Sequence, residues 1–495
     1  MSLDQTQIDH LAAQTLPPAR LLIDGDWVEG QGTPLEVLSP IDGRQITTLS
    51  SASAEDVARA TAAARQAFED GRWSRKSPAQ RKAVLYRLAD LIDAHTHELA
   101  VLGVRDNGTE ISMALRAEPT SAAQTFRYYA EAIDKISGEI APTAHNVLGL
   151  VHKEPVGVVA AIVPWNFPLM IGAWKLAPAL AMGNSVILKP AETASLTLLK
   201  LGELAQEAGV PPGVLNVVTG PGAVTGEALS LSHDVDVLVF TGSGTTGRRL
   251  LQASAKSNLK RCYLELGGKS PNIIFADAPD LAAAARASAM AIFRNAGQVC
   301  VAGSRLLVQD QVHDEFLAEL VKATQGLTVG NPLSLSTQVG AVNSLRQLDA
   351  NLAFAETAEK EGGQIALGGG RLLTETGGYY MAPTVVTGVE SHHNLFQNEV
   401  FGPILAVTRF KDEAEAIRLA NATDFGLAAG VWTRDISRAH RMVRAIRAGV
   451  VHVNTYGGAD MTVPLGGVRQ SGNGHDKSLH ALDKYTDLKT AWIQL

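Results

Sequence analysis

Two cysteines are the only thiols in this chain of 495 residues, and one of them stands in a setting suited to nucleophilic chemistry. Cys300 follows the polar and small residues 295–298, whereas Cys262 lies in an apolar stretch. A thiolate is the reactive form, and an unperturbed thiol has a pKa of about 8.5, so a catalytic cysteine needs help to ionise. A lone cysteine in an apolar stretch is most often an inert core residue, which we expect for Cys262.

A glycine-rich segment provides a candidate nucleotide site. The expected strand 235–240 runs into the pattern Gly-Ser-Gly-Thr-Thr-Gly at 242–247, a match to the dinucleotide fingerprint between strand and helix. Glycines there let the backbone approach a pyrophosphate at a helix N-terminus, whose free N–H groups favour anions. An acidic residue about twenty residues later usually binds the ribose, which would be Glu265. Taken alone, the match is explained equally well by a structural turn.

Four segments together resemble the aldehyde dehydrogenase superfamily and change the assignment of Glu265. In chain order they are residues 164–168 (Pro-Trp-Asn-Phe-Pro), 265–271, 295–300 and 399–403. They stand in the family's order and at its spacing, and the resemblance runs from about residue 22 to residue 495. It implies an α/β fold with a Rossmann-like NAD-binding domain, a second α/β catalytic domain and a small β oligomerisation arm.

The resemblance also implies a mechanism and four catalytic residues. Cys300 is the nucleophile, Asn166 and the backbone N–H of Cys300 form the oxyanion hole, and Glu265 is the general base. The thiolate adds to the aldehyde, the oxyanion collapses with loss of hydride to the nicotinamide, and water activated by Glu265 hydrolyses the thioester. Lys175 is the candidate for helping Cys300 to ionise.

The cofactor implied is NAD. In the family, residues 162–165 line the ribose and nicotinamide approach, Lys189 and Glu192 bind the adenine ribose, and Glu399 binds the nicotinamide ribose. A carboxylate at Glu192 would repel a 2′-phosphate, which favours NAD and leaves NADP as a weaker cofactor. The cofactor-binding residues predicted in this way are Ile162, Val163, Pro164, Trp165, Lys189, Glu192, Gly222, Phe240, Gly242, Ser243, Gly244, Thr245, Thr246, Gly247, Leu266, Glu399 and Phe401.

The family's substrate tunnel falls on mostly apolar positions in this chain. Asp460, in the loop 454–464 near the expected tunnel mouth, is an exception, and we expect it to attract an amino or guanidino group. A solvated loop aspartate explains it equally well. The predicted substrate-binding residues are Phe167, Met170, Ile171, Trp174, Val299, Val301, Asp460 and Leu465.

Two further segments, 432–442 and 471–495, resemble the gamma-glutamyl-gamma-aminobutyraldehyde, guanidinobutyraldehyde and aminobutyraldehyde dehydrogenases of polyamine breakdown. The expected substrate is therefore an ω-amino, guanidino or gamma-glutamylamino butanal; a broad-specificity or betaine-type enzyme is the alternative. Residues 106–110 depart from the common family pattern, and we expect them on a helical region away from the thiol. There are two rival hypotheses. In the first, coenzyme A rather than water accepts the acyl group; in the second, the protein is a non-catalytic NAD-binding or structural relative.

Short apolar runs alternate with helical stretches, as in a parallel sheet covered on both faces. The alternation predicts strands at 156–163, 185–188, 214–218 and 235–240, and a second series at 272–275, 305–308, 404–407, 428–432 and 450–453. We assign residues 1–131 and 151–265 to the NAD-binding domain, 266–465 to the catalytic domain, and 132–150 and 478–495 to the oligomerisation arm.

The charge and composition of the chain indicate which classes of partner it is expected to bind. The net charge of −7 and the absence of a basic run argue against nucleic acid. The N-terminus lacks the features of a secretory signal, and the longest apolar run is too short to cross a membrane. We therefore expect a cytoplasmic protein that binds a small aldehyde.

The tail from Lys484 onward alternates polar and apolar residues, which predicts an exposed strand. Because an unpaired strand edge usually pairs with another chain, we expect a homodimer or homotetramer. No cluster has zinc-ligand spacing, and His392 and His393 fit a solvated loop, so no metal is predicted.

Overall fold

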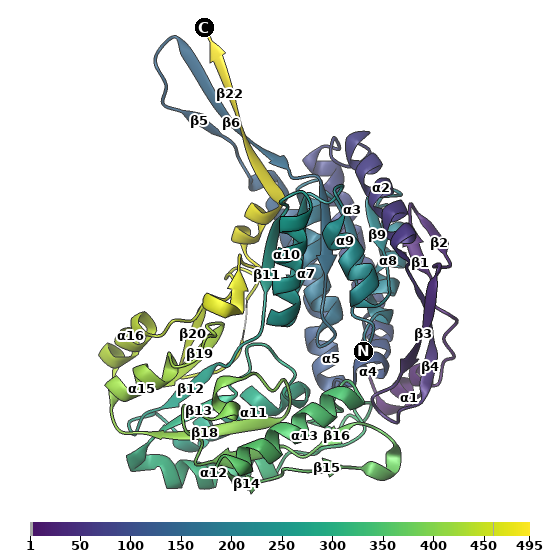
Figure 1. Cartoon of the computed structure of the whole chain (residues 1–495). Helices are drawn as coiled ribbons and strands as arrows, with labels where there is room; N and C mark the ends of the chain where they lie inside the picture. Colours follow the sequence, from purple (N-terminus) through teal and green to yellow (C-terminus); the bar gives the residue numbers. More distant parts are fainter. Residues whose placement is uncertain (1–2, 459) are drawn as a thin grey trace.

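The computed structural model describes residues 3–458 and 460–495 and contains two large sheets. Figure 1 shows the first sheet and its helices in the upper part of the molecule, the second sheet in the lower part, and a narrow arm that carries the C-terminus away from both. The predicted α/β class is confirmed.

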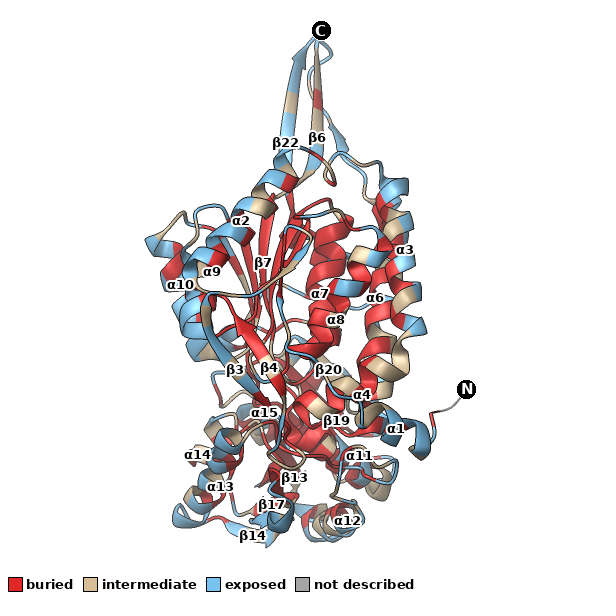
Figure 2. Ribbon diagram, turned by 90° about the vertical axis from the view of Figure 1, so that its right-hand side faces the viewer, coloured by how far each residue is buried: buried red, intermediate tan, exposed pale blue. Residues whose placement is uncertain are grey.

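The first sheet has eight strands in the order β2-β1-β9-β8-β7-β10-β11-β21. Its central strands β9, β8, β7, β10 and β11 run parallel, as the continuous apolar runs predict. All five residues of β7 and of β8 are buried, and Figure 2 shows these strands inside a shell of helices. The strands are β1 (Leu21–Ile23), β2 (Asp26–Val28), β7 (Val158–Ile162), β8 (Ser185–Lys189), β9 (Leu215–Val217), β10 (Val237–Thr241), β11 (Arg261–Glu265) and β21 (Gly472–Asn473).

Helices cover both faces of this sheet. A capping box at Ser77 begins α3 (Pro78–Ala94): the Ser77 side chain accepts from the Gln80 backbone N–H, and the Gln80 side chain accepts from the Ser77 backbone N–H. No helix among residues 3–458 and 460–495 is long and apolar enough to cross a membrane. The helices of this part are α1 (Gln5–Ala12), α2 (Ala54–Glu69), α3 (Pro78–Ala94), α4 (Thr96–Asn107), α5 (Ile111–Ala117), α6 (Pro119–Ala132), α7 (Pro168–Ala181), α8 (Leu196–Ala208), α9 (Glu227–Leu231) and α10 (Gly244–Lys256).

The second sheet has seven strands in the order β14-β17-β18-β13-β12-β19-β20, and only β14 is antiparallel to its neighbour. Each strand predicted in this half is present. The strands are β12 (Pro271–Ile274), β13 (Arg305–Gln309), β14 (Gln364–Leu367), β17 (Thr384–Thr387), β18 (Ile404–Phe410), β19 (Ala428–Trp432) and β20 (Val450–Val453); the helices are α11 (Leu281–Phe293), α12 (His313–Gln325), α13 (Leu345–Lys360), α14 (Asn394–Gln397), α15 (Glu413–Ala420) and α16 (Ile436–Ala445).

The arm is a three-stranded antiparallel sheet made of β5 (Glu139–Ala141), β6 (Val147–Pro155) and β22 (Thr486–Gln494). The predicted C-terminal strand is therefore present, and it forms an edge of this sheet. Two hairpins complete the fold, β3 (Gly32–Leu38) with β4 (Gln45–Ser51) and β15 (Arg371–Leu372) with β16 (Tyr380–Met381).

Candidate active site

The carboxyl ends of the central strands in the first sheet bring several predicted site residues to one edge. Ile162 ends β7 and pairs with Lys189 at the end of β8. On the other side Phe240 of β10 pairs with Ile162, and Thr241 pairs with Glu265 at the end of β11. Ligands of open α/β sheets bind at this edge, so the register alone brings the predicted cofactor residues and the predicted base together.

A left-handed turn directs the chain into Cys300. Asn295 and Ala296 both have φ of 50°, and Gly297 has φ of 75°. An alanine in this region is unusual and strained, which marks the turn as held by its surroundings. Only glycine fits at 297, because a Cβ there would lie 2.1 Å from the carbonyl oxygen of Gly402. The turn thus docks directly on the segment that carries Glu399.

Hydrogen bonds from both halves of the chain hold this turn. Asn166 Nδ2 donates to the carbonyl of Gln298 at 2.8 Å, which leaves its second amide hydrogen for another acceptor. The Asn295 backbone N–H donates to Glu110 Oε1 at 3.1 Å, and Thr109 Oγ1 donates to Asn295 Oδ1 at 2.7 Å. The expectation that residues 106–110 lie away from the thiol is therefore wrong: their polar side chains support the thiol turn.

The surroundings of Cys300 favour the neutral thiol. Burial and the nearby carboxylates of Glu399 and Glu265 raise its pKa to about 12, while the backbone N–H groups of Val301 and of Cys300 itself lower it. These N–H groups point at the sulfur. They therefore lie close to the substrate oxygen that would become an anion when the sulfur attacks an aldehyde. In contrast, Cys262 lies in β11 with its sulfur near carbonyl oxygens of Leu250 and Lys260, and it is buried as predicted.

Glu265 lies beside a buried cluster of charges. Asp476 accepts from Lys175 Nζ at Oδ2 and from Lys484 Nζ at Oδ1, each at 2.5 Å, and all three side chains are buried. Burial and the charge of Asp476 raise the pKa of Glu265, whereas Lys175 and Lys484 lower it. Glu265 Oε1 has no hydrogen-bond partner among the described residues. A carboxylate with a raised pKa and a free oxygen is suited to taking a proton from water.

The structure thus pairs Lys175 Nζ with Asp476 Oδ2 at 2.5 Å, and the charge of Glu265 also acts on Lys175. Asp476 and Lys484 were not predicted as site residues. Their only sequence signal was the subgroup resemblance of segment 471–495, which does not reveal that three ionisable side chains are buried together.

No side chain larger than that of glycine fits at positions 267 and 268, shortly after Glu265. A Cβ at Gly267 would lie 2.0 Å from Glu399 Oε2, and one at Gly268 would lie 2.5 Å from the carbonyl oxygen of Cys300. Gly268 also donates its N–H to Glu399 Oε1 at 2.8 Å. This close packing brings Glu399 and the chain at Cys300 against the same two glycines.

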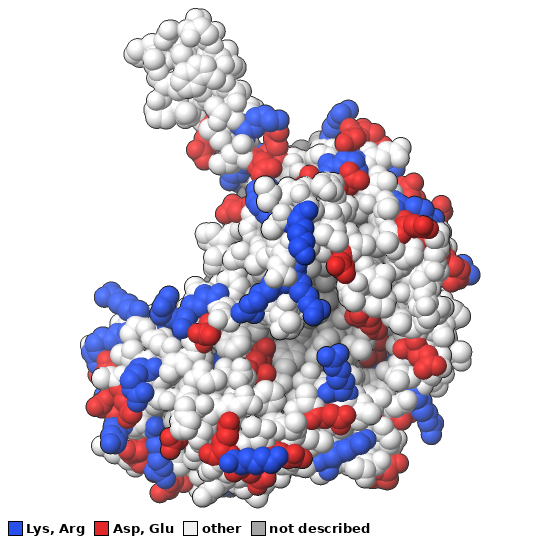
Figure 3. Space-filling view, viewed as in Figure 1, with Lys and Arg blue, Asp and Glu red and all other residues white. Residues whose placement is uncertain are grey.

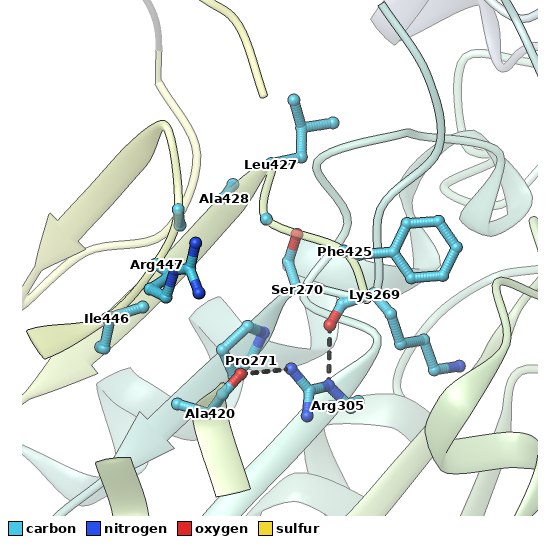
Figure 4. Close-up of a pocket in the computed structure, with 12 residues that line it drawn as sticks. Lys269, Ser270, Pro271, Arg305, Ala420, Phe425, Leu427, Ala428, Ile446 and Arg447 are labelled. Carbon is cyan, nitrogen blue, oxygen red and sulfur yellow. Dashed lines mark hydrogen bonds between the residues drawn. The ribbon is translucent and has the colours of Figure 1, made fainter. Parts of the chain in front are cut away.

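Arg305 holds the same segment, residues 265–271, through hydrogen bonds to backbone carbonyls. Its Nε donates to the carbonyl of Lys269 at 2.7 Å, and one Nη donates to the carbonyl of Ala420 at 2.8 Å (Figure 4). The other Nη donates to the carbonyl of Leu419 at 2.8 Å. The cavity beside these residues holds about 10 Å³, room for about one water molecule. It is therefore part of the support of the site and no substrate pocket.

The glycine-rich segment lies between β10 and α10, where the fingerprint predicts it. Ser243 is the N-cap of α10 and accepts from the N–H of Thr246, and the Gly242 N–H donates to the carbonyl of Glu265 at 3.0 Å. A Cβ at Gly247 would lie 2.9 Å from a methyl group of Leu266, so this glycine lets the helix approach the strand end.

A second group of predicted cofactor residues meets nearby. Glu192 accepts the N–H of Gly222 at 2.6 Å and lies 3.6 Å from Lys189 Nζ. Trp165 packs edge-on against Phe401, with ring centroids 5.2 Å apart. In the space-filling view this face of the molecule is hollowed between the two sheet-bearing parts, and basic side chains stand at the rim of the hollow (Figure 3).

The predicted tunnel residues are buried or half-buried, except for Asp460. Phe167, Ile171, Trp174 and Val299 are buried, and Met170, Val301 and Leu465 are half-buried. Asp460 is exposed, and its Oδ1 accepts from the backbone N–H and the hydroxyl of Thr462 at 2.8 and 2.6 Å. These bonds give the aspartate a local role in its loop.

Three side chains could in principle surround a metal ion, Glu390, His392 and His393. However, His393 Nδ1 lies 3.1 Å from the Glu390 backbone N–H and accepts from it. In a neutral imidazole the other nitrogen then carries the proton and cannot act as a metal ligand. The geometry gives this group no support as a metal centre.

Comparison with known proteins shows the family to which the chain belongs. The profile of the aldehyde dehydrogenase family matches residues 27–491. The chain belongs to the aldehyde dehydrogenase family, a family of oxidoreductases.

Individual relatives match over almost the whole chain. The sequence is 50% identical to the NADP/NAD-dependent aldehyde dehydrogenase PuuC of Escherichia coli, over 96% of each chain. The structure superposes on gamma-glutamyl-gamma-aminobutyraldehyde dehydrogenase from Burkholderia cenocepacia with a TM-score of 0.97 and 47% identity, covering 100% of both chains. It superposes on an indole-3-acetaldehyde dehydrogenase in complex with NAD+ with a TM-score of 0.98 and 48% identity, again covering 100% of both chains.

Proposed function

We propose that this protein oxidises an aldehyde to its carboxylic acid with NAD, through a thioester on Cys300 that Glu265 helps to hydrolyse. The observation that carries the proposal is the meeting of Cys300, Asn166, Glu265 and Glu399 around one turn, although they come from four segments of the chain.

Each residue has a task that its surroundings allow. Cys300 Sγ forms a bond to the aldehyde carbon, and its proton leaves to a base. The oxygen of the adduct becomes an anion, which accepts from the free hydrogen of Asn166 Nδ2 and from the backbone N–H of Cys300. After the oxidation step Glu265 takes a proton from water, the hydroxide adds to the thioester, and the C–S bond breaks to release the acid.

The residues at the sheet edge fit a nicotinamide dinucleotide, which accepts the hydride when it is bound. The N-terminus of α10 offers unpaired N–H groups for a pyrophosphate, and two carboxylates, Glu192 and Glu399, are available for the hydroxyls of two riboses. Ile162–Trp165, Gly222, Phe240, Leu266 and Phe401 complete the proposed cofactor set. A carboxylate at Glu192 opposes a 2′-phosphate, so we expect NAD to be preferred over NADP.

The proposed substrate is an ω-amino, guanidino or gamma-glutamylamino butanal. Two of the relatives described above support it, because PuuC and the Burkholderia enzyme are half identical or nearly so to this chain along its whole length. The proposed tunnel lining comprises Phe167, Met170, Ile171, Trp174, Val299, Val301, Asp460 and Leu465.

We also propose that the arm, residues 132–150 and 478–495, joins subunits into a homodimer or homotetramer. It leaves Ile140, Leu488 and Trp492 exposed, at 75%, 68% and 67% of their surface. Exposed apolar residues beside an unpaired strand edge favour association. Light scattering on Trp492→Glu should report smaller particles than the wild-type protein; equal masses would contradict this role.

The test of the proposed function is NADH formation over a panel of aldehydes, with Cys300→Ala as control. The panel contains 4-guanidinobutanal, 4-aminobutanal, the gamma-glutamyl amide, propanal and betaine aldehyde. Activity that is lost in Cys300→Ala and greatest on polyamine-derived aldehydes supports the full proposal. A flat profile would retain the chemistry and overturn the substrate, acyl transfer only to coenzyme A would overturn the hydrolytic step, and no activity on any aldehyde would overturn the function.

A further inference from the structure

Arg294 is a cation beside the thiol that the proposed mechanism does not use. It directly follows α11 and begins the turn that leads to Cys300 six residues later. Its side chain is half-buried, and its Nε is buried with no hydrogen-bond partner among the described residues. No carboxylate of residues 3–458 and 460–495 forms an ion pair with it. A buried guanidinium without a counter-ion is costly, because it loses hydration and gains no partner.

The position of Arg294 links it to the proposed tunnel. A Cβ at Gly457 would lie 3.2 Å from Arg294 Nη1, so the guanidinium packs against the loop predicted at the tunnel mouth. The same loop is fixed to the tunnel residue Val301, whose carbonyl accepts from the Tyr456 hydroxyl at 2.9 Å. A Cβ at Gly458 would meet open space. The glycines of this loop therefore leave room beside a charged side chain.

The charges around Arg294 do not cancel its own. Burial lowers its pKa, and the groups that act on it include Tyr456, Glu110, Arg116 and Cys300. Glu110 is the only carboxylate in that set, and burial raises its pKa to about 7, so at neutral pH it is only partly ionised. Arg116 adds a second positive charge, and His452, whose pKa is lowered, adds none. The guanidinium itself stays protonated.

Another cation, Lys477, lies near the loop that carries Asp460. Lys477 is buried, with Nζ 6.0 Å from the ring centre of Trp174. The hydrogen bonds from Thr462 lower the pKa of Asp460, and the positive charge of Lys477 lowers it further. Asp460 is the acid expected to attract cations, but its Oδ1 is already bonded to Thr462.

The described surroundings of the tunnel thus hold three cations, Arg294, Arg116 and Lys477, and the exposed carboxylate of Asp460. They also hold two buried carboxyl groups, Glu110 and Glu118, and Glu118 Oε2 accepts from the backbone N–H of Met170 at 2.8 Å. Burial raises the pKa of these two groups to about 7 and about 8, which weakens their negative charge at neutral pH.

We propose that Arg294 is a specificity-determining residue, which makes the tunnel favour aldehydes that carry a carboxylate over aldehydes that carry an ammonium or guanidinium group. This inference rests on the proposed function and narrows its substrate class. Among the three butanals considered, only the gamma-glutamylamino compound carries a carboxylate, next to the α-ammonium group of its glutamyl end. The free amine and the guanidine would bring a like charge towards Arg294.

The test compares three aldehydes of similar length: 5-oxopentanoate, hexanal and 4-(trimethylammonio)butanal. The variants are Arg294→Leu, Arg294→Gln and Arg294→Lys, and Arg20→Leu on the distant surface is the matched control. Near a protein surface one contact between unit charges is worth a factor of about ten or more. The ratio of kcat/KM for the anion to that for the cation should therefore fall about tenfold or more in Arg294→Leu and Arg294→Gln. Arg294→Lys should keep most of the ratio, and Arg20→Leu should not change it.

The neutral aldehyde separates this inference from the proposed function. If hexanal is oxidised by every variant but the ratio is the same in Arg294→Gln as in the wild type, Arg294 does not select substrates and the inference is overturned. A higher ratio in the neutral variants would overturn it as well. If the wild-type protein oxidises none of the three but does oxidise a polyamine-derived aldehyde of the panel above, the proposed function stands and the preference for carboxylates is overturned. If it oxidises no aldehyde at all, the proposed function itself fails. Arg294→Gln keeps a polar side chain, so the test does not depend on the folding of Arg294→Leu alone.

Discussion

The two cysteines lie in very different backbone settings: Cys262 is buried in a strand, and Cys300 is half-buried after a turn. Cys262 is part of the regular strand β11, and its sulfur faces the carbonyl oxygens of Leu250 and Lys260. Burial raises the pKa of this thiol, while Ser254 and the charge of Lys260 lower it. Cys300 follows a left-handed turn that is bonded from several segments, and backbone N–H groups point at its sulfur. Burial raises the pKa of both thiols. The comparison teaches that the turn and its donors, rather than burial, distinguish a thiol placed for attack from one placed for packing.

The most direct way to break this comparison is to remove each thiol. Cys300→Ala should lower kcat by about a thousandfold or more, because the covalent step is lost. Cys262→Ala should retain near-wild-type kcat and lose about 1 kcal/mol of folding free energy through lost packing. NADH formation and thermal unfolding measure the two effects. A large loss of activity in Cys262→Ala with an unchanged melting temperature would contradict the assignment.

Glu265→Gln separates attack from hydrolysis. The variant keeps the shape of the side chain but cannot accept a proton, so steady-state turnover should fall by about a hundredfold to ten-thousandfold. A stoichiometric burst of NADH should remain, followed by slow turnover. Stopped-flow kinetics measure both phases. Loss of the burst together with turnover would instead assign Glu265 to the deprotonation of Cys300.

The buried charges beside Glu265 predict opposite pH shifts. Glu265 acts as a base only when ionised, and its pKa is raised by Asp476 and lowered by Lys484. Asp476→Asn should therefore move the rising limb of the hydrolysis rate to lower pH, and Lys484→Met should move it to higher pH. The pH profile of the steady-state rate in each variant measures the shift. If the rising limb moved in the same direction in both variants, a group other than Glu265 would control it.

A smaller effect is expected from the support of the thiol turn. Thr109→Val removes the donor to Asn295 Oδ1 and leaves that buried acceptor unpaired, at a cost of about 1–3 kcal/mol. Activity and unfolding by denaturant should both decline. Thr47→Val is the matched control, since its hydroxyl bonds to Pro17 far from the turn. An equal loss of activity in both variants would remove the special role of the turn.

The smallest effect concerns strain in the same turn. Ala296 has φ of 50°, a conformation that glycine adopts freely. Ala296→Gly should change the free energy of unfolding by about 1 kcal/mol or less and leave the activity near that of the wild type. Ala296→Val should lower the melting temperature, because a branched side chain disfavours this conformation. The reverse order of stability would contradict the strain.

Some of this arrangement follows from sequence patterns and some does not. Continuous apolar strands predict a parallel sheet, and its register then brings Ile162, Lys189 and Glu265 to one edge without further information. The glycines at 267 and 268 likewise signal a close approach. These features are local or follow from sheet geometry, so sequence patterns reveal them.

Other features depend on contacts between distant segments. Lys175 and Asp476 are 301 positions apart, and Thr109 and Asn295 are 186 apart. Segment 106–110 belongs to a helical region, yet the fold returns its end to the thiol turn. Arg294 is adjacent to a predicted motif, but nothing in its sequence neighbours shows that its guanidinium lacks a partner. Such features require the three-dimensional packing of both sheets.

The measurement that tests the account most directly is the location of the acyl group in Glu265→Gln. The variant is mixed with NAD and hexanal, quenched in acid during the burst and digested, and its peptides are analysed by mass spectrometry. The account predicts an acyl adduct on the peptide that contains Cys300 and none on the peptide that contains Cys262. An adduct on Cys262, or oxidation of the aldehyde with no adduct on either thiol, would contradict it.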